Sequence, residues 1–155
     1  MTSQVDVQYA TELINCPDAT TIVKWVSAAL THQKEDYSLS IKIIDEDEMK
    51  TLNFYYRQKQ KPTNVLSFPC QLPVEVRGNM LGDIAICAPV VQQEAILQAK
   101  PLEAHFAHMV VHGVLHLLGF DHENDQDANE MESLEVTILE KLGFKDPYGV
   151  HITHD

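Results

Sequence analysis

The chain has 155 residues, of which 11 are Lys or Arg and 23 are Asp or Glu, so its formal net charge is −12. The acidic balance excludes a polybasic protein that holds nucleic acid or membrane by bulk charge, and the hydrophobic content of 45% excludes a disordered chain. The length suits a single domain. We therefore predict one domain over residues 1–155, with 145–155 as a candidate mobile tail.

The cysteines and the N-terminal segment indicate where the protein works. Cys16, Cys70 and Cys87 are widely spaced and form no CxxC motif, so we expect neither a disulfide framework nor a thiolate zinc site. The N-terminal segment has neither the basic nor the apolar region of a signal peptide. No apolar run approaches the roughly 20 residues that span a bilayer. We expect a cytoplasmic protein without a membrane partner.

Alternating and helical patterns define the N-terminal elements. Apolar residues alternate over 5–9 and 38–44, which predicts two strands. Between them, Asp18 opens a helical pattern whose apolar face runs to Leu30. Asp45 is a suitable N-cap for the short helix that follows the second strand.

Turn residues at 62–64 separate this part from two further predicted strands, over 65–68 and 81–87. The segment 72–79 between these strands has the composition of an exposed loop or hairpin arm.

Three helices are predicted in the C-terminal half, over about 89–99, 101–118 and 124–142, with Gly119 and Gly143 as stops. Strands come first and helices later, with one helix between the first two strands. We therefore predict an α+β domain, in which one mixed sheet of about four strands packs with about five helices.

Four histidines form a line on the helix predicted at 101–118. At 100° per residue they occupy a stripe only about 80° wide, and they are His105, His108, His112 and His116. The rest of this helix is apolar on nearly every side, which is typical of a buried helix. Buried imidazole rings need hydrogen-bonding or metal partners.

The spacing of three histidines predicts a metal site at the end of this buried helix. His112 and His116 stand at i and i+4, so both rings can reach one ion. Gly119 lets the chain turn, and His122 can then supply a third nitrogen. Three neutral imidazoles with an open fourth position are typical of catalytic zinc. Nickel or manganese are alternative ions.

Other interpretations of the histidines stay open at this point. They could be core residues, some of them stabilising the helix C-terminus. A purely structural zinc would want a fourth protein ligand. His108 could replace His122 as the third ligand, although we expect His105 and His108 to be hydrogen-bonded rings beside the site.

The same spacing occurs in metalloproteases, where a Glu after the first histidine is the general base. Gly113 occupies that position here, and Met131 lies within a helical pattern rather than in a Met-turn. We therefore do not expect peptidase activity of that kind.

The string HGVLHLLGFDHE at 112–123 resembles the signature of the YbeY family of bacterial rRNA maturation factors. Two further blocks resemble the family in the same order: LNFYYR with PTNVLSFP, over 52–57 and 62–69, and LGDIAI at 81–86. The resemblance extends from about residue 38 to 142.

This resemblance implies a single-strand-specific, metal-dependent endoribonuclease that acts in 16S rRNA 3′-end maturation and ribosome quality control. It implies one zinc per chain, bound by His112, His116 and His122, and a functional arginine at Arg57. Where this chain has Asn64, the family often has Asp. The implied partners are single-stranded RNA, the 16S rRNA precursor and the ribosome or a ribosomal protein, and not DNA.

A small basic cluster supports RNA as the substrate. Arg57, Lys59 and Lys61 lie close together and follow Tyr55 and Tyr56. Cations can hold phosphates, and aromatic rings can stack on unpaired bases. We predict Arg57 as a catalytic residue and Tyr56, Lys59 and Lys61 as substrate-binding residues. The alternative is a solvated helix end, where cations favour the helix dipole.

Other polar residues receive structural interpretations. Asp83 is expected in a turn, and Ser67 is expected to hydrogen-bond backbone. Asp121 could accept an imidazole N–H or cap a helix. Four glutamates are expected on the solvated face of the last helix, although Glu135 could turn inward; they are Glu130, Glu132, Glu135 and Glu140.

The predicted chemistry is hydrolysis of a phosphodiester in unpaired RNA. Zinc would activate a water or polarise a phosphoryl oxygen, and Arg57 would stabilise developing charge. No general base is indicated, so the RNA 2′-OH is an alternative nucleophile. Two alternative functions are a non-catalytic, zinc-stabilised ribosome-assembly factor and a metallohydrolase acting on a non-RNA substrate.

Overall fold

Four strands and six helices occur along residues 4–59, 61–121 and 124–148, the parts of the chain that the computed structural model describes. The strands are β1 (Gln4–Ala10), β2 (Ser38–Ile44), β3 (Val65–Pro69) and β4 (Met80–Cys87). The helices are α1 (Ala19–Ala29), α2 (Glu46–Arg57), α3 (Val74–Arg77), α4 (Ala88–Leu97), α5 (Leu102–Leu117) and α6 (Asp125–Lys141). The predicted α+β class is confirmed. The helix beyond the expected five is α3, a single turn within the predicted hairpin arm.

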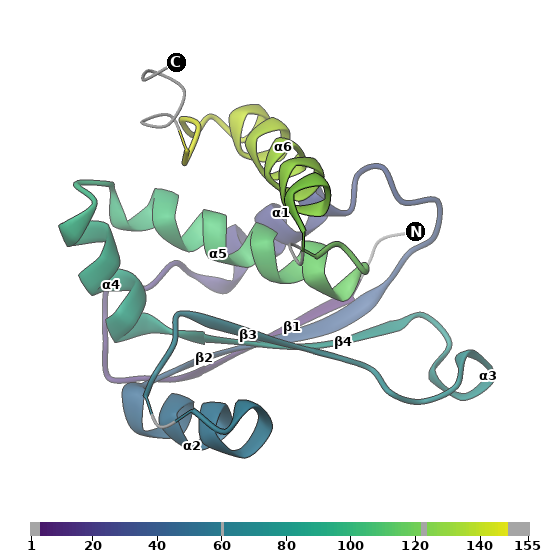
Figure 1. The fold of residues 1–155 in the computed structure, drawn as a ribbon, viewed down its shortest axis with the longest axis horizontal. Coiled ribbons are helices and arrows are strands. Elements are labelled where there is room, and N and C mark those ends of the chain that lie inside the picture. The colour runs from purple at the N-terminus through teal and green to yellow at the C-terminus, as the bar shows by residue number, and fades with distance from the viewer. Residues whose placement is uncertain (1–3, 60, 122–123, 149–155) are drawn as a thin grey trace.

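The sheet is mixed, with strand order β1-β2-β4-β3. β1, β2 and β4 are parallel, and β3 runs antiparallel to β4 at one edge. Parallel neighbours need a crossover connection, which α1 supplies between β1 and β2. The hairpin arm that contains α3 connects β3 to β4 and extends beyond the sheet (Figure 1).

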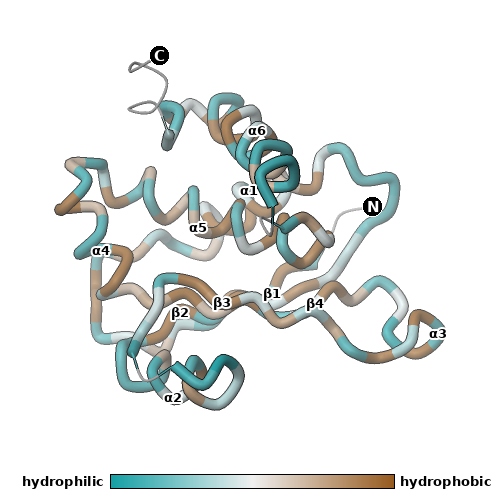
Figure 2. Tube along the Cα trace, viewed as in Figure 1, coloured by the Kyte–Doolittle hydropathy of each residue, from teal (hydrophilic) through white to brown (hydrophobic). Residues whose placement is uncertain are grey.

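Helices cover both faces of the sheet (Figure 1). α1, α5 and α6 lie on one side, and α2 lies on the other. The larger apolar core lies between the sheet and the α1–α5 side, and includes Ile22, Trp25, Ile41, Ile84, Phe106 and Val110. Full burial of each large apolar side chain contributes roughly 1.5–3 kcal/mol. The strands are largely hydrophobic, whereas α2 and α6 are largely hydrophilic (Figure 2), as expected of outer helices.

Two glycines allow close approaches around β4. Gly82 in β4 has φ +142°, and a Cβ there would lie 2.2 Å from the carbonyl oxygen of Phe68. Gly113 in α5 faces the sheet, where a Cβ would lie 3.0 Å from the side chain of Ile84. The hydroxyl of Ser67 donates to the carbonyl of Gly113 at 3.1 Å. The sheet therefore fills the space that a metalloprotease-type Glu at position 113 would need, and the predicted backbone bond of Ser67 is confirmed.

One expectation about β4 is wrong. Asp83 lies within the strand, paired with Ser40 of β2 and Phe68 of β3, and not in a turn. Its side chain is exposed and accepts a hydrogen bond from the Ser40 hydroxyl. A glycine is needed at position 82 because the backbone of Phe68 lies very close to it. In the sequence alone, the same glycine looks like a turn signal.

The first part of the candidate tail contacts the body of the domain. Lys100 donates from Nζ to the carbonyl of Pro147 at 3.0 Å, and Tyr148 reaches Glu135 of α6. Residues 149–155 lie outside the described residues. Within the described ranges, no helix has the length and apolar character needed to cross a membrane.

Candidate metal centre and cleft

The end of α5 has the geometry that its sequence predicts. Gly119 has φ +104°, its N–H donates to the carbonyl of His116 at 3.0 Å, and the N–H of Phe120 donates to the carbonyl of Leu115 at 3.0 Å. This pair of bonds is a Schellman motif, which favours glycine because of the left-handed backbone. The motif ends α5 directly after His116, so that His112 and His116 lie one turn apart on the same face of its last turns.

His112 and His116 are directed toward each other at the end of α5. Their Nε2 atoms lie 3.1 Å apart, and their rings meet nearly at right angles. Two nitrogens bound to one tetrahedral ion at 2.0–2.1 Å would lie about 3.3 Å apart. The pair therefore fits two ligands of one zinc-sized ion. His122, the third predicted ligand, lies outside the described residues.

A cleft of about 690 Å³ lies beside this histidine pair. It includes Arg57 from the end of α2, Asn64, Ser67 of β3, and Asp121 after α5. β3 is one of the two edge strands of the sheet, so its outer side is available to line a cleft. The fold thus brings Arg57 to the same cleft as His112 and His116, although about 55 residues of chain separate them in sequence.

The other predicted substrate-binding residues lie outside this lining. Tyr56 is 62% exposed, with its ring centroid 4.9 Å from that of Phe68. Lys59 and Lys61 are exposed in the segment after α2. Asn53 donates from Nδ2 to the carbonyl of Lys61 at 2.7 Å, which holds this segment against α2. Tyr56, Lys59 and Lys61 are thus exposed basic and aromatic residues close to Arg57 in the sequence.

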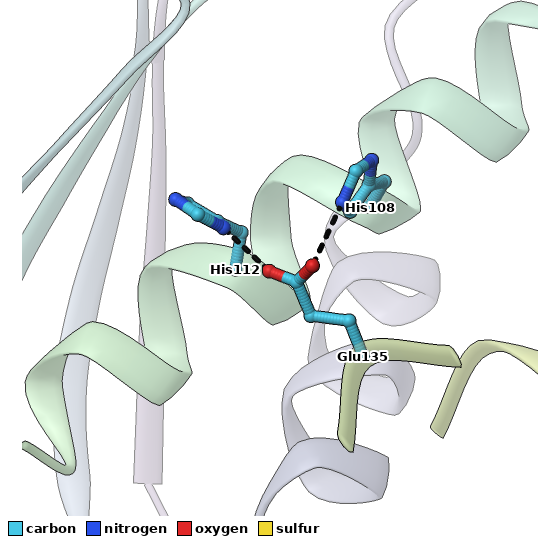
Figure 3. A group of neighbouring side chains, drawn as sticks. All are labelled: His108, His112 and Glu135. Carbon is cyan, nitrogen blue, oxygen red and sulfur yellow. Dashed lines mark hydrogen bonds and ion pairs between the residues drawn. The ribbon is translucent and has the colours of Figure 1, made fainter. Parts of the chain in front are cut away.

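Glu135 is a functional candidate that the sequence indicates only weakly. It lies on α6, its side chain is fully buried, and it contacts His112 and His108 (Figure 3). The Tyr148 hydroxyl also donates to it. Burial raises the pKa of its carboxyl, but the hydrogen bonds from His108 and His112 outweigh this and lower it to about 2. The signal was its position on the apolar face of α6, four residues after Met131 and three before Ile138.

His108, His112 and Glu135 together could hold a metal ion. Their ligand atoms lie within 4.8 Å of one another, and His108 and Glu135 are buried. This group shares His112 with the predicted set but would use its other ring nitrogen, Nδ1 instead of Nε2. Two candidate arrangements for a metal thus share His112, one facing the cleft and one inside the protein.

A second histidine–carboxylate contact lies at the start of α5. Nε2 of His105 lies 2.9 Å from Oε1 of Glu94, and Asn64 donates from Nδ2 to the same carboxylate at 3.1 Å. Burial lowers the pKa of His105, and the contact with Glu94 opposes this shift. Asn64, for which the sequence indicated no role, therefore joins the cleft to His105 through Glu94. The expectation that His105 and His108 are hydrogen-bonded rings is confirmed.

Comparison with known proteins decides the family. A family model described as endoribonuclease YbeY matches residues 6–143. The chain belongs to this family. The solution structure of TM1509 from Thermotoga maritima is similar over 97% of this chain and 93% of that chain, with 24% sequence identity and a TM-score of 0.61. That similarity shows the shared fold.

Membership of the YbeY endoribonuclease family indicates the general chemistry of the protein. The family supports a nuclease role in rRNA maturation, and therefore a hydrolase with an RNA substrate. The three blocks from which the resemblance was inferred all lie within the matched residues 6–143.

Proposed function

We propose that the protein is a single-strand-specific, metal-dependent endoribonuclease. It acts in the cytoplasm, in the maturation of the 16S rRNA 3′ end and in ribosome quality control. One zinc per chain is held by His112, His116 and His122. The observation that supports this proposal best is the pair of Nε2 atoms 3.1 Å apart in a cleft that also contains Arg57.

The residues in and beside the cleft have different roles in this proposal. When bound, zinc supplies Lewis acidity and positive charge at the histidine pair. Arg57 holds the phosphate of the scissile bond and stabilises the negative charge that develops on it. Tyr56, Lys59 and Lys61 bind the flanking nucleotides by base stacking and phosphate contacts. Unpaired RNA suits such a surface because its bases are free to stack on tyrosine.

The acidic total of the chain limits how RNA is bound. A net charge of −12 opposes attraction by bulk charge, so specificity depends on the metal and the cluster around Arg57. We propose that the ribosome or a ribosomal protein delivers the substrate, because this small cationic surface binds free RNA weakly.

Cleavage of matched RNAs tests the proposal. The purified protein should cut a single-stranded RNA with the 16S 3′-end sequence and leave its duplex form intact. A chelator should stop cleavage, and added zinc should restore it. His116→Ala, purified in parallel, should cut no faster than a blank preparation, which controls for contaminating nuclease. Cleavage at the wild-type rate by metal-depleted His116→Ala would contradict the proposal.

Arg57 separates this proposal from a non-catalytic assembly factor. Arg57→Ala should reduce the cleavage rate by about 10²–10³-fold, the usual effect of removing one transition-state donor. Arg57→Lys should keep part of the rate, because it retains the charge but loses the bidentate geometry. Both variants should bind zinc as the wild type does. A cellular role that survives Arg57→Ala unchanged would favour the assembly factor.

A further inference from the structure

The carboxylate of Glu135 receives three hydrogen bonds in a fully buried position between α5 and α6, and Figure 3 shows the two that come from His108 and His112. His112 approaches Oε2 with Nδ1 at 2.5 Å, and His108 approaches Oε1 with Nε2 at 3.2 Å. The Tyr148 hydroxyl donates to Oε1 at 2.5 Å. A buried carboxylate is stable only when such donors replace water. The three contacts therefore meet the needs of an ionised Glu135.

The distances distinguish a hydrogen bond from a shared metal ion. Two ligand atoms of one tetrahedral ion lie about 3.3 Å apart. The 2.5 Å between Nδ1 of His112 and Oε2 of Glu135 is much shorter, below even the roughly 2.7–2.9 Å of charge-assisted N–H···O bonds, so this contact is a hydrogen bond and not a pair of metal ligands. The 3.1 Å between the Nε2 atoms of His112 and His116 is close to the value for shared ligation. The two nitrogens of the His112 ring therefore have different roles: Nδ1 hydrogen-bonds Glu135, and Nε2 is placed to bind a metal together with His116.

The hydrogen bond to Glu135 fixes the state of the His112 ring. A neutral imidazole carries one N–H, so a proton on Nδ1 leaves a lone pair on Nε2. In Figure 3 the second nitrogen of His112 points away from Glu135. That nitrogen is the Nε2 that lies beside His116 in the cleft. The buried carboxylate thus selects the tautomer that can bind a metal from the cleft.

We propose that Glu135 is a positioning residue that holds His112 in the Nδ1–H tautomer, and thereby sets the affinity of the cleft for a divalent metal. The inference rests on the proposed metal site of His112 and His116, but the tautomer itself is a property of the metal-free protein. Carboxylates that orient metal-binding histidines in this way contribute 10–100-fold to metal affinity.

Replacement of Glu135 by glutamine has a specific expected effect. Two donors, His108 Nε2 and the Tyr148 hydroxyl, meet at Oε1, and one donor, His112 Nδ1, meets Oε2. A glutamine amide has a single oxygen. That oxygen accepts two hydrogen bonds if it takes the place of Oε1, but only one if it takes the place of Oε2. With the oxygen in the place of Oε1, the NH₂ group faces His112 and donates to Nδ1, which moves the ring proton to Nε2. The variant has nearly the same size but the wrong tautomer.

Nitrogen NMR of the histidine rings in the metal-free protein tests the inference. The spectrum is recorded at about pH 8, where imidazoles are ordinarily neutral, and the His112 signals are assigned by their loss in His112→Gln. The wild type should show the Nδ1–H tautomer, and Glu135→Gln should show Nε2–H. An Nε2–H tautomer in the wild type would overturn the inference without any variant having to fold.

Zinc affinity, measured by competition with a chromophoric chelator, provides the second readout. Glu135→Gln should bind zinc 10–100-fold more weakly than the wild type. Glu140→Gln removes the same charge from the exposed side of α6, and Tyr148→Phe removes a different donor from Glu135; both should stay within about threefold. Wild-type affinity in Glu135→Gln would overturn the inference. If the tautomer and affinity results hold while the wild type fails to cut RNA, only the proposed function is contradicted.

Discussion

The four histidines of α5 differ in what each ring contacts. His105 pairs with Glu94 of α4, and His108 pairs with Glu135 of α6. His112 lies between Glu135 and His116, one nitrogen toward each. One stripe of like residues thus acquires different roles because each ring meets a different neighbouring element. These neighbours place the pair of Nε2 atoms in the cleft and keep the other rings inside the protein.

The buried His105 makes the stability of the fold depend on pH. Burial lowers the pKa of His105 in the folded state below its unfolded value of about 6.5. The fold therefore favours the neutral ring, so this contribution is present above about pH 6.5 and is lost as pH falls below that value. His105→Gln should lose less stability than the wild type between about pH 7 and pH 5, by a few tenths to about 1 kcal/mol.

Urea denaturation of both proteins across this pH range measures the effect. His32→Gln is the matched control, because His32 is exposed on the surface. That variant should follow the wild-type pH dependence. A His105→Gln protein with the same pH dependence as the wild type would contradict the assignment.

For single residues, the sequence predicts the positions on α5 better than it predicts which residues of other elements contact them. The spacing of His112, His116 and Gly119 follows from helical periodicity, which is a local property. The inward position of Glu135 was foreseen only as one option, because periodicity places it on the apolar face but cannot identify what that face meets. Tyr148 was not foreseen, since its contact depends on how the chain returns after α6.

The elements follow the sequence pattern closely, and the exceptions have local causes. All four strands were predicted because β1 and β2 alternate, and β3 and β4 are short apolar runs between turn signals. The order β1-β2-β4-β3 depends on how crossovers pack and has no signature in the residues. Asp83 was misplaced in a turn because Gly82 serves strand packing instead of chain reversal.

Gly82 is predicted to be essential for the pairing of β3 with β4. In Gly82→Ala the added Cβ would meet the Phe68 carbonyl at 2.2 Å, a backbone atom that cannot rotate away. Backbone strain and overpacking together should lower the free energy of unfolding by about 4 kcal/mol.

Gly78→Ala separates the clash from the backbone conformation. Gly78 also has positive φ, with ψ −121°, but a Cβ there would meet nothing within 4 Å, so its cost should come from backbone strain alone, about 1–3 kcal/mol. Chemical denaturation measures both values. Equal losses for the two variants would show that the contact with Phe68 is unimportant.

For the whole molecule, the fold reconciles an acidic chain with an RNA substrate. The net charge is −12, yet Arg57 lines the cleft, and Lys59 and Lys61 lie on the adjoining segment. Composition indicates the total charge correctly but not its distribution. The convergence of Arg57 with His112 and His116 depends on the placement of α2 and α5 around β3, which only the folded chain provides.

The small number of cations predicts a weak salt dependence of RNA binding. Three phosphate contacts, from Arg57, Lys59 and Lys61, should give a slope of about −2 for log affinity against log salt concentration. Lys59→Gln and Lys61→Gln should each reduce the slope by about 0.7. Fluorescence anisotropy with a labelled single-stranded RNA measures these slopes. A slope steeper than about −5 would show that a larger cationic surface binds the RNA.

The zinc content of the purified protein and of two variants, measured by elemental analysis, tests the central claim most directly. We place the ion on the Nε2 atoms of His112 and His116, in the cleft. We therefore predict about one zinc per chain in the wild type and in His108→Ala, and a loss of zinc in His116→Ala. Zinc that stays in His116→Ala and disappears from His108→Ala would place the ion in the buried group of His108, His112 and Glu135, and would contradict the account.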